Sequence, residues 1–272
     1  MEKDYIYPDI DDKITKAFIK ENEPFPSYWE KSEENVLKLI KEKTRKHLSR
    51  SKDSWLLDAG CGTGRLLPEF QRYFSNILAI DPDPLQIDKA KKIAKNKGFV
   101  EKVVFKVTSA EQLDWKEESV DVILSSHIIQ HVHTETIQRI LCKFHKVLKS
   151  DGLLFIMTTH SRKNRGYYAK AILKGSKSIE QKIGKEEFNS LIINNQNILP
   201  IHFFSVQNLE NILKNSGFIL IQYRSYHILS KTRFLADKED RDKLVNTSDS
   251  LKPKFGRDIM LLSQKQASHI DR

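Results

Sequence analysis

Short apolar runs alternate along the chain with longer segments in which apolar residues recur at helical spacing. Five runs are typical of strands, and they span residues 55–58, 77–80, 103–107, 120–125 and 153–158. Helix candidates lie between them, including residues 84–97 and 134–149. In the second, apolar residues follow an i, i+3, i+4, i+7 spacing, which predicts a face that packs on a sheet. Because strands alternate with helices, the pattern predicts an α/β fold with a doubly wound, mostly parallel sheet.

The C-terminal part of the chain continues this pattern with a polar interruption. Residues 206–215 predict a helix, and apolar runs at 218–223 and 259–263 predict two further strands. Residues 237–257 are polar and show no apolar period, so we expect a long loop there.

A glycine-rich turn follows the first predicted strand. It reads Asp58-x-Gly60-x-Gly62-x-Gly64, and a second carboxylate, Asp81, ends the next strand. Glycine lets the backbone take positive φ and approach a ligand closely, and an acidic residue at that second position accepts hydrogen bonds from ribose hydroxyls. The third glycine of the dinucleotide fingerprint and the lysine of a phosphate-binding loop are both missing. The spacing therefore predicts a nucleoside cofactor other than a dinucleotide or a nucleoside triphosphate.

This turn resembles the first motif of the class I S-adenosylmethionine-dependent methyltransferases, and the chain is similar to the small-molecule members of the ubiquinone/menaquinone-biosynthesis type. The resemblance covers about residues 54–160, with weaker agreement to the end. It implies a seven-stranded Rossmann-like sheet whose last two strands form an antiparallel pair at one edge. It also implies S-adenosyl-L-methionine as cofactor and S-adenosyl-L-homocysteine as product.

With this family as a guide, the chain divides into four parts. We expect an N-terminal helical cap at 1–52, a cofactor-binding core at 53–160 and a basic insertion on the substrate side at 161–204. Residues 205–272 complete the core with edge strands and the polar loop 237–257. The cap and the insertion predict helical lids over the site.

The resemblance also implies which residues bind the cofactor. They are Tyr28, Asp58, Gly60, Cys61, Gly62, Gly64, Asp81, Pro82, Ser109, Ala110, Glu111 and Ser126. Asp81 has an alternative role as a helix cap before Pro84, and Asp83 is an alternative ribose acceptor. Ser109 stands where the family more often has aspartate, so adenine recognition is expected to lean on backbone contacts.

Two histidines after the fourth predicted strand are the acid/base candidates. His127 and His131 should border the transferable methyl group, because ligands lie beyond the carboxyl ends of parallel strands. Histidine exchanges a proton near neutral pH. A packing role is the alternative for His131, and an aromatic core contact is the alternative for Tyr28. A metal site is not expected, because the remaining histidines lack ligand spacing.

The net charge of +10 comes from two segments. Residues 31–52 and 160–200 each hold eight basic and three acidic residues, and the remainder is balanced. Such segments are either solvated surfaces or an electropositive rim that attracts an anionic substrate. Basic side chains that would border the substrate are Arg162, Lys163, Arg165, Lys170 and Lys174, and the aromatic residues of the insertion are Tyr167, Tyr168 and His202.

These features predict in-line methyl transfer to an O, N or C nucleophile of a small molecule. The basic excess keeps tRNA methylation open as an alternative, and a non-catalytic cofactor-binding protein is a second alternative. The chain has two cysteines, no run of 18 apolar residues and a charged start, so we expect no disulfide framework, no membrane span and a cytoplasmic location. No particular oligomeric state is predicted.

Overall fold

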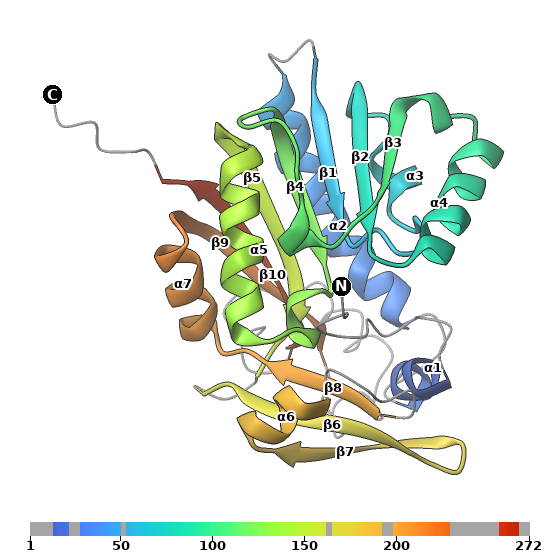
Figure 1. Ribbon diagram of the computed structural model, residues 1–272, viewed down its shortest axis with the longest axis vertical. Coiled ribbons are helices and arrows are strands. Elements are labelled where there is room, and N and C mark those ends of the chain that lie inside the picture. The colour runs from blue at the N-terminus through green and yellow to red at the C-terminus, as the bar shows by residue number, and fades with distance from the viewer. Residues whose placement is uncertain are drawn as a thin grey trace, which may run out of the picture.

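The main sheet has seven strands. The computed structural model describes residues 13–21, 28–49, 53–161, 165–191, 198–228 and 256–266, with the side chains of 19–21, 28 and 228 excepted. The strand order is β3-β2-β1-β4-β5-β10-β9 (Figure 1). The strands are β1 (Trp55–Ala59), β2 (Asn76–Asp81), β3 (Val103–Val107), β4 (Val120–Ser126), β5 (Leu148–Thr159), β9 (Phe218–Ile228) and β10 (Gly256–Lys265). β10 pairs antiparallel with both β5 and β9, and all other pairs in the sheet are parallel, which confirms the predicted Rossmann-like sheet.

Helices cover both faces of this sheet. On one face lie α5 (Thr134–Val147) and α7 (Val206–Asn215), and on the other lie α2 (Tyr28–Leu48), α3 (Leu67–Phe70) and α4 (Pro84–Asn96). Successive strand residues point to opposite faces, so Leu57 packs beneath α5 while Leu56 packs beneath α2 and α3. Strands covered on both sides are apolar throughout, which is why the sequence shows them as continuous runs.

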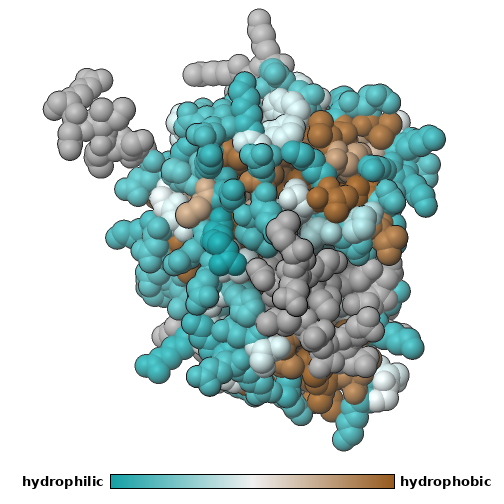
Figure 2. Space-filling view, in the orientation of Figure 1, coloured by the Kyte–Doolittle hydropathy of each residue, from teal (hydrophilic) through white to brown (hydrophobic). Residues whose placement is uncertain are grey.

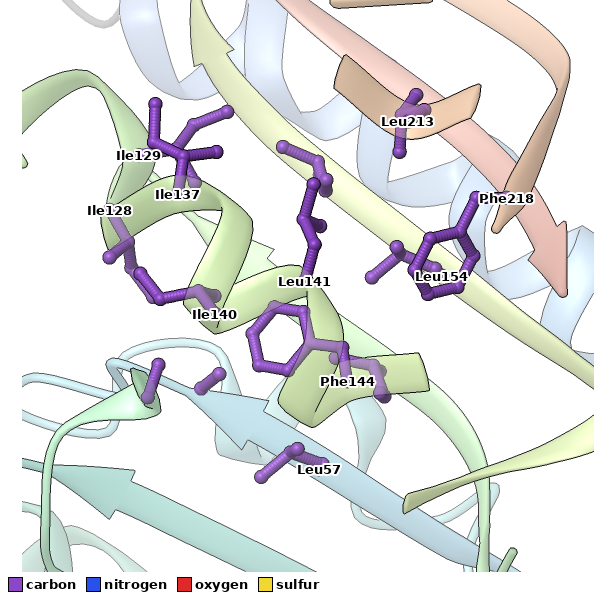
Figure 3. Packing of buried hydrophobic residues seen from close by; sticks show 14 of the residues in the cluster. Leu57, Ile128, Ile129, Ile137, Ile140, Leu141, Phe144, Leu154, Leu213 and Phe218 are labelled. Atoms are coloured by element: carbon purple, nitrogen blue, oxygen red, sulfur yellow. The ribbon is translucent and has the colours of Figure 1, made fainter. Parts of the chain in front are cut away.

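The predicted apolar face of α5 forms the centre of the first core. Figure 3 shows Ile137, Ile140, Leu141 and Phe144 directed at the sheet from this helix, toward Leu57. Phe144 has no exposed surface. Truncation of such a residue to alanine typically costs about 3–5 kcal/mol, because it leaves a cavity.

A second, smaller sheet lies beyond the carboxyl ends of the parallel strands, at the bottom of Figure 1. Its antiparallel strands have the order β7-β6-β8 and are β6 (Tyr167–Lys174), β7 (Lys177–Ile183) and β8 (Ile198–Phe203). It is joined by α6 (Lys185–Leu191) and packs against α1 (Lys13–Glu21). We call α1, β6, β7, α6 and β8 together the lid.

The insertion at 161–204 therefore differs from the helical lid predicted for it. Its described part holds three strands and one short helix. The local signal is Gly175, with φ +66°, in the two-residue turn that joins β6 to β7. Alternate residues of β6, Ala169 and Ala171, are buried against α1. The alternation of buried and exposed residues extends over only a few positions of β6, and its other face carries charged residues. The strand was therefore not recognised from the sequence.

The remaining elements are short or shift by a few residues. Three 3₁₀ turns are η1 (Val100–Lys102), η2 (Ala110–Gln112) and η3 (Ile129–His131). In the predicted loop 237–257, residues 237–255 lie outside the described part. Gly256 and Arg257 were predicted in that loop but begin β10. No helix among the described residues is long and apolar enough to cross a membrane, and most of the face drawn in Figure 2 is hydrophilic.

Candidate active site

One cavity of about 440 Å³ opens where β1, β2, β4 and β5 end and the lid begins. Its lining comes from distant parts of the chain. One half contains the glycine-rich turn with Asp58 and Asp81, and we call it the cofactor half. The other half is bordered by the histidines after β4, by the lid and by the β9–β10 hairpin, and we call it the acceptor half.

The three glycines of the turn serve different ends. All have positive φ: +65° at Gly60, +52° at Gly62 and +80° at Gly64. A Cβ at Gly64 would lie 2.9 Å from Cβ of Ala90 in α4, whereas a Cβ at Gly62 would meet nothing within 4 Å. Gly60 and Gly62 line the cavity, but Gly64 does not. Gly64 therefore allows close packing on α4, and Gly62 leaves open backbone toward a ligand.

Asp81 connects the end of β2 to the glycine-rich turn. Its Oδ2 accepts a hydrogen bond from the Gly62 N–H at 2.9 Å, and its Oδ1 accepts one from the Asp83 N–H at 2.9 Å. The capping role that the sequence left open belongs to Asp83, whose Oδ1 accepts from the Leu85 N–H at 2.8 Å. Asp81 is therefore positioned at the cavity wall independently of the helix cap.

Asp58 is buried in the cofactor half without a close cation of its own. Burial raises the pKa of its carboxyl to about 7; Arg65 opposes this effect and Asp81 adds to it. The Arg65 guanidinium is engaged by Glu33 of α2 in a two-pronged pair, at 2.6 and 2.9 Å. Burial alone would raise the Glu33 pKa, but the hydrogen bonds and charge of Arg65 outweigh it and hold that pKa low.

The structure brings only part of the predicted cofactor set to the cavity. Asp58, Gly60, Cys61, Gly62, Asp81 and Ser126 line it. Gly64, Pro82, Ser109, Ala110 and Glu111 are not among the lining residues, and the Tyr28 side chain lies outside the described residues. Ala110 instead packs into the core near α5. Burial raises the pKa of the Cys61 thiol, so it stays protonated.

His127 lines the acceptor half, but both of its ring nitrogens are engaged. Nδ1 lies 2.9 Å from Nε2 of Gln130, and Nε2 lies 3.1 Å from the Tyr226 hydroxyl. Thr158 donates to Oε1 of Gln130 at 2.9 Å, which directs the amide N–H at Nδ1. Burial lowers the His127 pKa, so the ring is neutral and donates from Nε2 to Tyr226. Its φ of +58° is a strained backbone conformation of the kind found at functional sites.

His131 differs because only one nitrogen is engaged. Nδ1 lies 2.8 Å from the Pro200 carbonyl oxygen of β8, and a carbonyl only accepts, so Nδ1 carries the proton. Burial lowers the His131 pKa to about 4, partly offset by that hydrogen bond, so the ring is neutral at pH 7. Nε2 is therefore an unprotonated lone pair with no hydrogen bond to a described residue. Of the two predicted histidines, His131 is the one free to accept a proton.

The polar end of the acceptor half comes from the β9–β10 hairpin and was not predicted from the sequence. His227 contacts Asp258 through Nδ1, and Arg257 donates to the same Asp258 oxygen from Nε at 3.1 Å and from Nη2 at 2.9 Å. Burial raises the Asp258 pKa, but Arg257 and His227 outweigh it and hold that pKa far below its usual range. Arg257 also lies over the Trp29 ring at 4.3 Å. The only sequence signal was the Arg-Asp pair just before the last apolar run.

The lid forms the apolar wall of the acceptor half. Phe18 of α1 packs against Leu199 and Ile201 of β8, and all three line the cavity. Hydrogen bonds attach the lid to the core, among them the His131–Pro200 bond and a 2.6 Å bond from Thr159 to the His202 carbonyl oxygen. The acceptor half is thus enclosed by apolar side chains from two segments that the sequence places far apart.

The polar and aromatic residues predicted to border the substrate do not line this cavity. They are Arg165, Tyr167, Tyr168, Lys170, Lys174 and His202; Arg162 and Lys163 lie outside the described residues. Lys170 instead pairs with Glu187 at 2.6 Å, and His202 stacks on Tyr168. Among the described residues, the basic insertion contributes apolar groups to the cavity.

Comparisons with known proteins agree with this geometry. A family model described as a methyltransferase domain matches residues 57–156. The ubiquinone/menaquinone biosynthesis C-methyltransferase UbiE of Campylobacter jejuni is 27% identical over 201 residues, which are 69% of this chain and 80% of that relative. Residues 57–156 thus match a methyltransferase domain, and the chain is similar to class I S-adenosylmethionine-dependent methyltransferases.

Two further comparisons extend this similarity. The ubiquinone biosynthesis O-methyltransferase of Pelagibacter ubique is 35% identical over 125 residues, which are 46% of this chain and 49% of that relative. A Burkholderia thailandensis 1,6-didemethyltoxoflavin-N1-methyltransferase, solved with S-adenosylhomocysteine, shares 17% identity and a TM-score of 0.55 over 93% of this chain and 88% of that chain. The structural likeness concerns the fold alone.

The cofactor half fits S-adenosyl-L-methionine, the cofactor that this similarity implies. The Gly62 position leaves an open cradle that a Cβ would fill. Asp81 presents a carboxylate to the cavity that could accept hydrogen bonds from a diol, and Asp58 is a buried carboxyl that no described cation neutralises closely. A cofactor that carries a sulfonium and an ammonium group supplies the missing positive charge.

Proposed function

We propose that this protein transfers a methyl group from S-adenosyl-L-methionine to an O, N or C nucleophile of a small molecule. The observation that carries the proposal is that one cavity joins the glycine-rich turn and Asp81 to the enclosed acceptor half. Methyl transfer needs a nucleophile held in line with the sulfur and protected from water. A single cavity with two chemically different halves meets that need.

In the proposed mechanism, the cofactor half holds and orients the donor. Asp81 would accept hydrogen bonds from the ribose hydroxyls, the backbone of Gly60 and Gly62 would permit close approach, and Asp58 would offer a carboxylate to the positively charged ligand; all four residues line the cavity. When bound, the cofactor supplies a methyl group on a positively charged sulfur that is a good leaving group. The protein therefore needs no strong nucleophile of its own.

On the acceptor side, His131 takes the proton that an O–H or N–H nucleophile loses. Its Nδ1 is held by Pro200, which leaves Nε2 as the proton acceptor. A positioned base contributes about 10²- to 10⁴-fold to such reactions. His127 acts as a positioning residue, because Gln130 and Tyr226 occupy both of its nitrogens.

A small molecule is preferred over tRNA as the acceptor. The lid places Phe18, Leu199 and Ile201 against the cavity, and such walls suit a compact, partly apolar ligand. The tRNA alternative rests on the basic excess of the sequence, and none of the described basic residues of 161–204 lines the cavity. The relatives named for ubiquinone biosynthesis also favour a small-molecule acceptor.

The proposal is tested in two steps. Calorimetry first measures binding of S-adenosyl-L-methionine and S-adenosyl-L-homocysteine to protein stripped of ligand; we expect binding to both. The protein is then incubated with cofactor labelled in the methyl group and with a cell extract separated into small-molecule and RNA fractions. Label should enter the small-molecule fraction and should be absent with the Asp81→Ala variant.

Three results contradict the proposal. If the protein does not bind the cofactor at millimolar concentration, it is not a methyltransferase that uses S-adenosyl-L-methionine. Label confined to the RNA fraction, together with tRNA retention that weakens steeply with salt, supports the tRNA alternative instead. Cofactor binding with no label in either fraction supports the non-catalytic alternative.

A further inference from the structure

The acceptor half ends in an ion pair, Arg257–Asp258, in which some of the hydrogen-bonding atoms have no partner among the described residues. Arg257 grips one oxygen of Asp258 with Nε and Nη2, and that oxygen also contacts His227. Within the described part of the chain, the other carboxylate oxygen, Oδ1, and the third guanidinium nitrogen, Nη1, are both buried and have no hydrogen-bond partner. Both residues line the cavity.

Unpaired buried polar groups of this kind destabilise the folded protein, and more so when they are charged. Asp258 has no exposed surface, and the Arg257 side chain is 14% exposed, so bulk water does not satisfy them. Packing holds them in place: the guanidinium lies 4.3 Å from the Trp29 ring centroid and 5.4 Å from that of Phe18. His227, which holds Asp258, has a strained φ of +51°.

The other charged groups near Arg257 and Asp258 already have partners, so this ion pair is the one we expect to contact a ligand. His227 is already engaged, with Nδ1 on Asp258 and Nε2 3.3 Å from the Trp29 carbonyl oxygen. Glu33 and Arg65 are engaged with each other. What the ion pair still offers is one acceptor, Oδ1, and one donor, Nη1.

We propose that Arg257 and Asp258 select the methyl acceptor: a neutral, planar molecule that presents a hydrogen-bond donor beside an acceptor, such as an amide or an enol next to a carbonyl. The donor of the ligand meets Oδ1 of Asp258, and its acceptor meets Nη1 of Arg257. A carboxylate at the same edge has two acceptors and a negative charge, so it faces Oδ1 with no proton between them and is disfavoured. This inference rests on the proposed function and specifies its substrate class.

The test uses matched pairs of planar probes that differ only at this edge. They are benzamide and benzoate, nicotinamide and nicotinate, and 2-hydroxybenzamide and 2-hydroxybenzoate. Binding is measured by calorimetry on the full chain saturated with S-adenosyl-L-homocysteine. In at least one pair the amide should bind, and every amide that binds should do so about tenfold or more tightly than its carboxylate, which corresponds to about 1.4 kcal/mol.

The Asp258→Asn variant gives a sharper result, because it keeps the shape and reverses the hydrogen-bond pattern. Arg257 still requires an acceptor, so the new amide turns its oxygen to Arg257 and its NH₂ group into the position of Oδ1. The preference should then reverse toward the carboxylate probes. Arg257→Lys, which keeps the charge but loses the fork, should weaken binding of both members of a pair without reversing their order.

The outcomes separate this inference from the proposed function. If the wild-type protein binds S-adenosyl-L-homocysteine but prefers the carboxylates, shows no preference or binds no amide, the inference is overturned and the proposed function stands. If the Asp258→Asn variant binds S-adenosyl-L-homocysteine normally and keeps the wild-type preference, the inference also fails. If the wild-type protein does not bind S-adenosyl-L-homocysteine, the proposed function fails first. Should Asp258→Asn not fold, the wild-type preference and Arg257→Lys still decide.

Discussion

Two buried aspartates face one cavity from its two halves, and their carboxyl groups behave in opposite ways. In the cofactor half, burial raises the pKa of Asp58 to about 7, because the nearest cation, Arg65, is engaged by Glu33. In the acceptor half, Arg257 and His227 hold the pKa of Asp258 far below its usual range despite complete burial. Both residues lie in the same cavity, so the difference comes from their partners.

This contrast indicates how each half meets its ligand. In the described part of the cofactor half, the cation Arg65 is already paired with Glu33, so a positively charged ligand would complement Asp58. The acceptor half contains its own paired cation and carboxylate, and we expect it to require only a complementary neutral edge. A buried carboxyl without a cation stays partly protonated near pH 7, and a charged ligand then shifts it to the ionised form. The two halves therefore predict different responses to pH and to substitution.

The largest expected effect is the pH dependence of stability that Asp58 causes. Its folded pKa of about 7 lies above the ordinary aspartate value of 3.8, so its contribution to stability is fully present below pH 3.8 and is lost as the pH rises to 7. The full difference is roughly 4 kcal/mol. The buried neutral histidines produce the opposite slope but titrate alike in wild type and variant. In urea unfolding of ligand-free protein between pH 5 and pH 8, the wild type should therefore lose stability relative to Asp58→Asn as the pH rises.

Asp258→Asn is the matched control for that prediction. Asp258 is ionised throughout this pH range, so the variant should lower stability by a similar amount at each pH and keep the wild-type slope. An unchanged slope in Asp58→Asn would show that the contrast between the two aspartates is wrong.

The next effect separates the two histidines of the acceptor half. His131→Asn should lower kcat about 10²- to 10³-fold, because among the described histidines that line the cavity only His131 keeps a ring nitrogen without a hydrogen bond. His127→Asn should act mainly on the acceptor KM, since His127 positions its neighbours through Gln130 and Tyr226. Steady-state kinetics test both, with the Kd for S-adenosyl-L-homocysteine as the control for folding. Equal kcat losses in the two variants would argue against assigning the base to His131.

A third effect distinguishes Asp81 from its neighbour Asp83. Asp81→Ala should weaken S-adenosyl-L-homocysteine binding about 100-fold, because two ribose hydroxyls lose a charged acceptor. Asp83→Ala removes only the cap of α4 and should cost about 1 kcal/mol of stability with little change in that Kd. Calorimetry measures the Kd for S-adenosyl-L-homocysteine, and urea unfolding measures the stability of both variants. If Asp83→Ala weakened binding more than Asp81→Ala, Asp83 would be the ribose acceptor instead.

The smallest effect distinguishes two glycines of the turn: Gly64, which packs against α4, and Gly62, which lines the cavity. Gly64→Ala should cost about 2 kcal/mol of stability, because the new Cβ lies within 3.0 Å of α4 and the φ of +80° suits glycine alone. Gly62→Ala should cost about 1 kcal/mol, since its Cβ meets nothing. Urea unfolding without ligand compares the two, and an equal loss would show that α4 moves to accept the methyl group.

The cofactor half was largely predictable from the sequence because it is local. Gly60, Gly62 and Asp58 lie within five consecutive positions, and Asp81 ends the adjacent strand, so strand period and turn chemistry bring them together. The helix from 206 to 215 and the strand at 103–107 also begin and end where the pattern predicted. Residues 109–111 were a weaker inference, and the structure keeps them off the cavity wall.

The acceptor half was not predictable in the same way. Phe18, Ile201 and Asp258 come from segments far apart in the sequence, and each reads locally as an ordinary apolar or charged residue. The lid strands were hidden because a two-residue period over eight positions is a weak signal beside frequent lysines. Basic composition pointed to an anionic substrate, but in the described residues those side chains pair with acids or lie away from the cavity.

The sequence by itself determined the sheet and the cofactor turn, because alternation, strand period and glycine conformation act over a few residues at a time. Only the tertiary structure decided which histidine keeps a free nitrogen, because the answer depends on a carbonyl 69 positions away, at Pro200. It also decided the character of the acceptor end, where His227, Arg257 and Asp258 meet across the β9–β10 hairpin. Hydrogen bonds and charges acquire their roles from spatial neighbours, and long-range neighbours are set by how the whole chain packs.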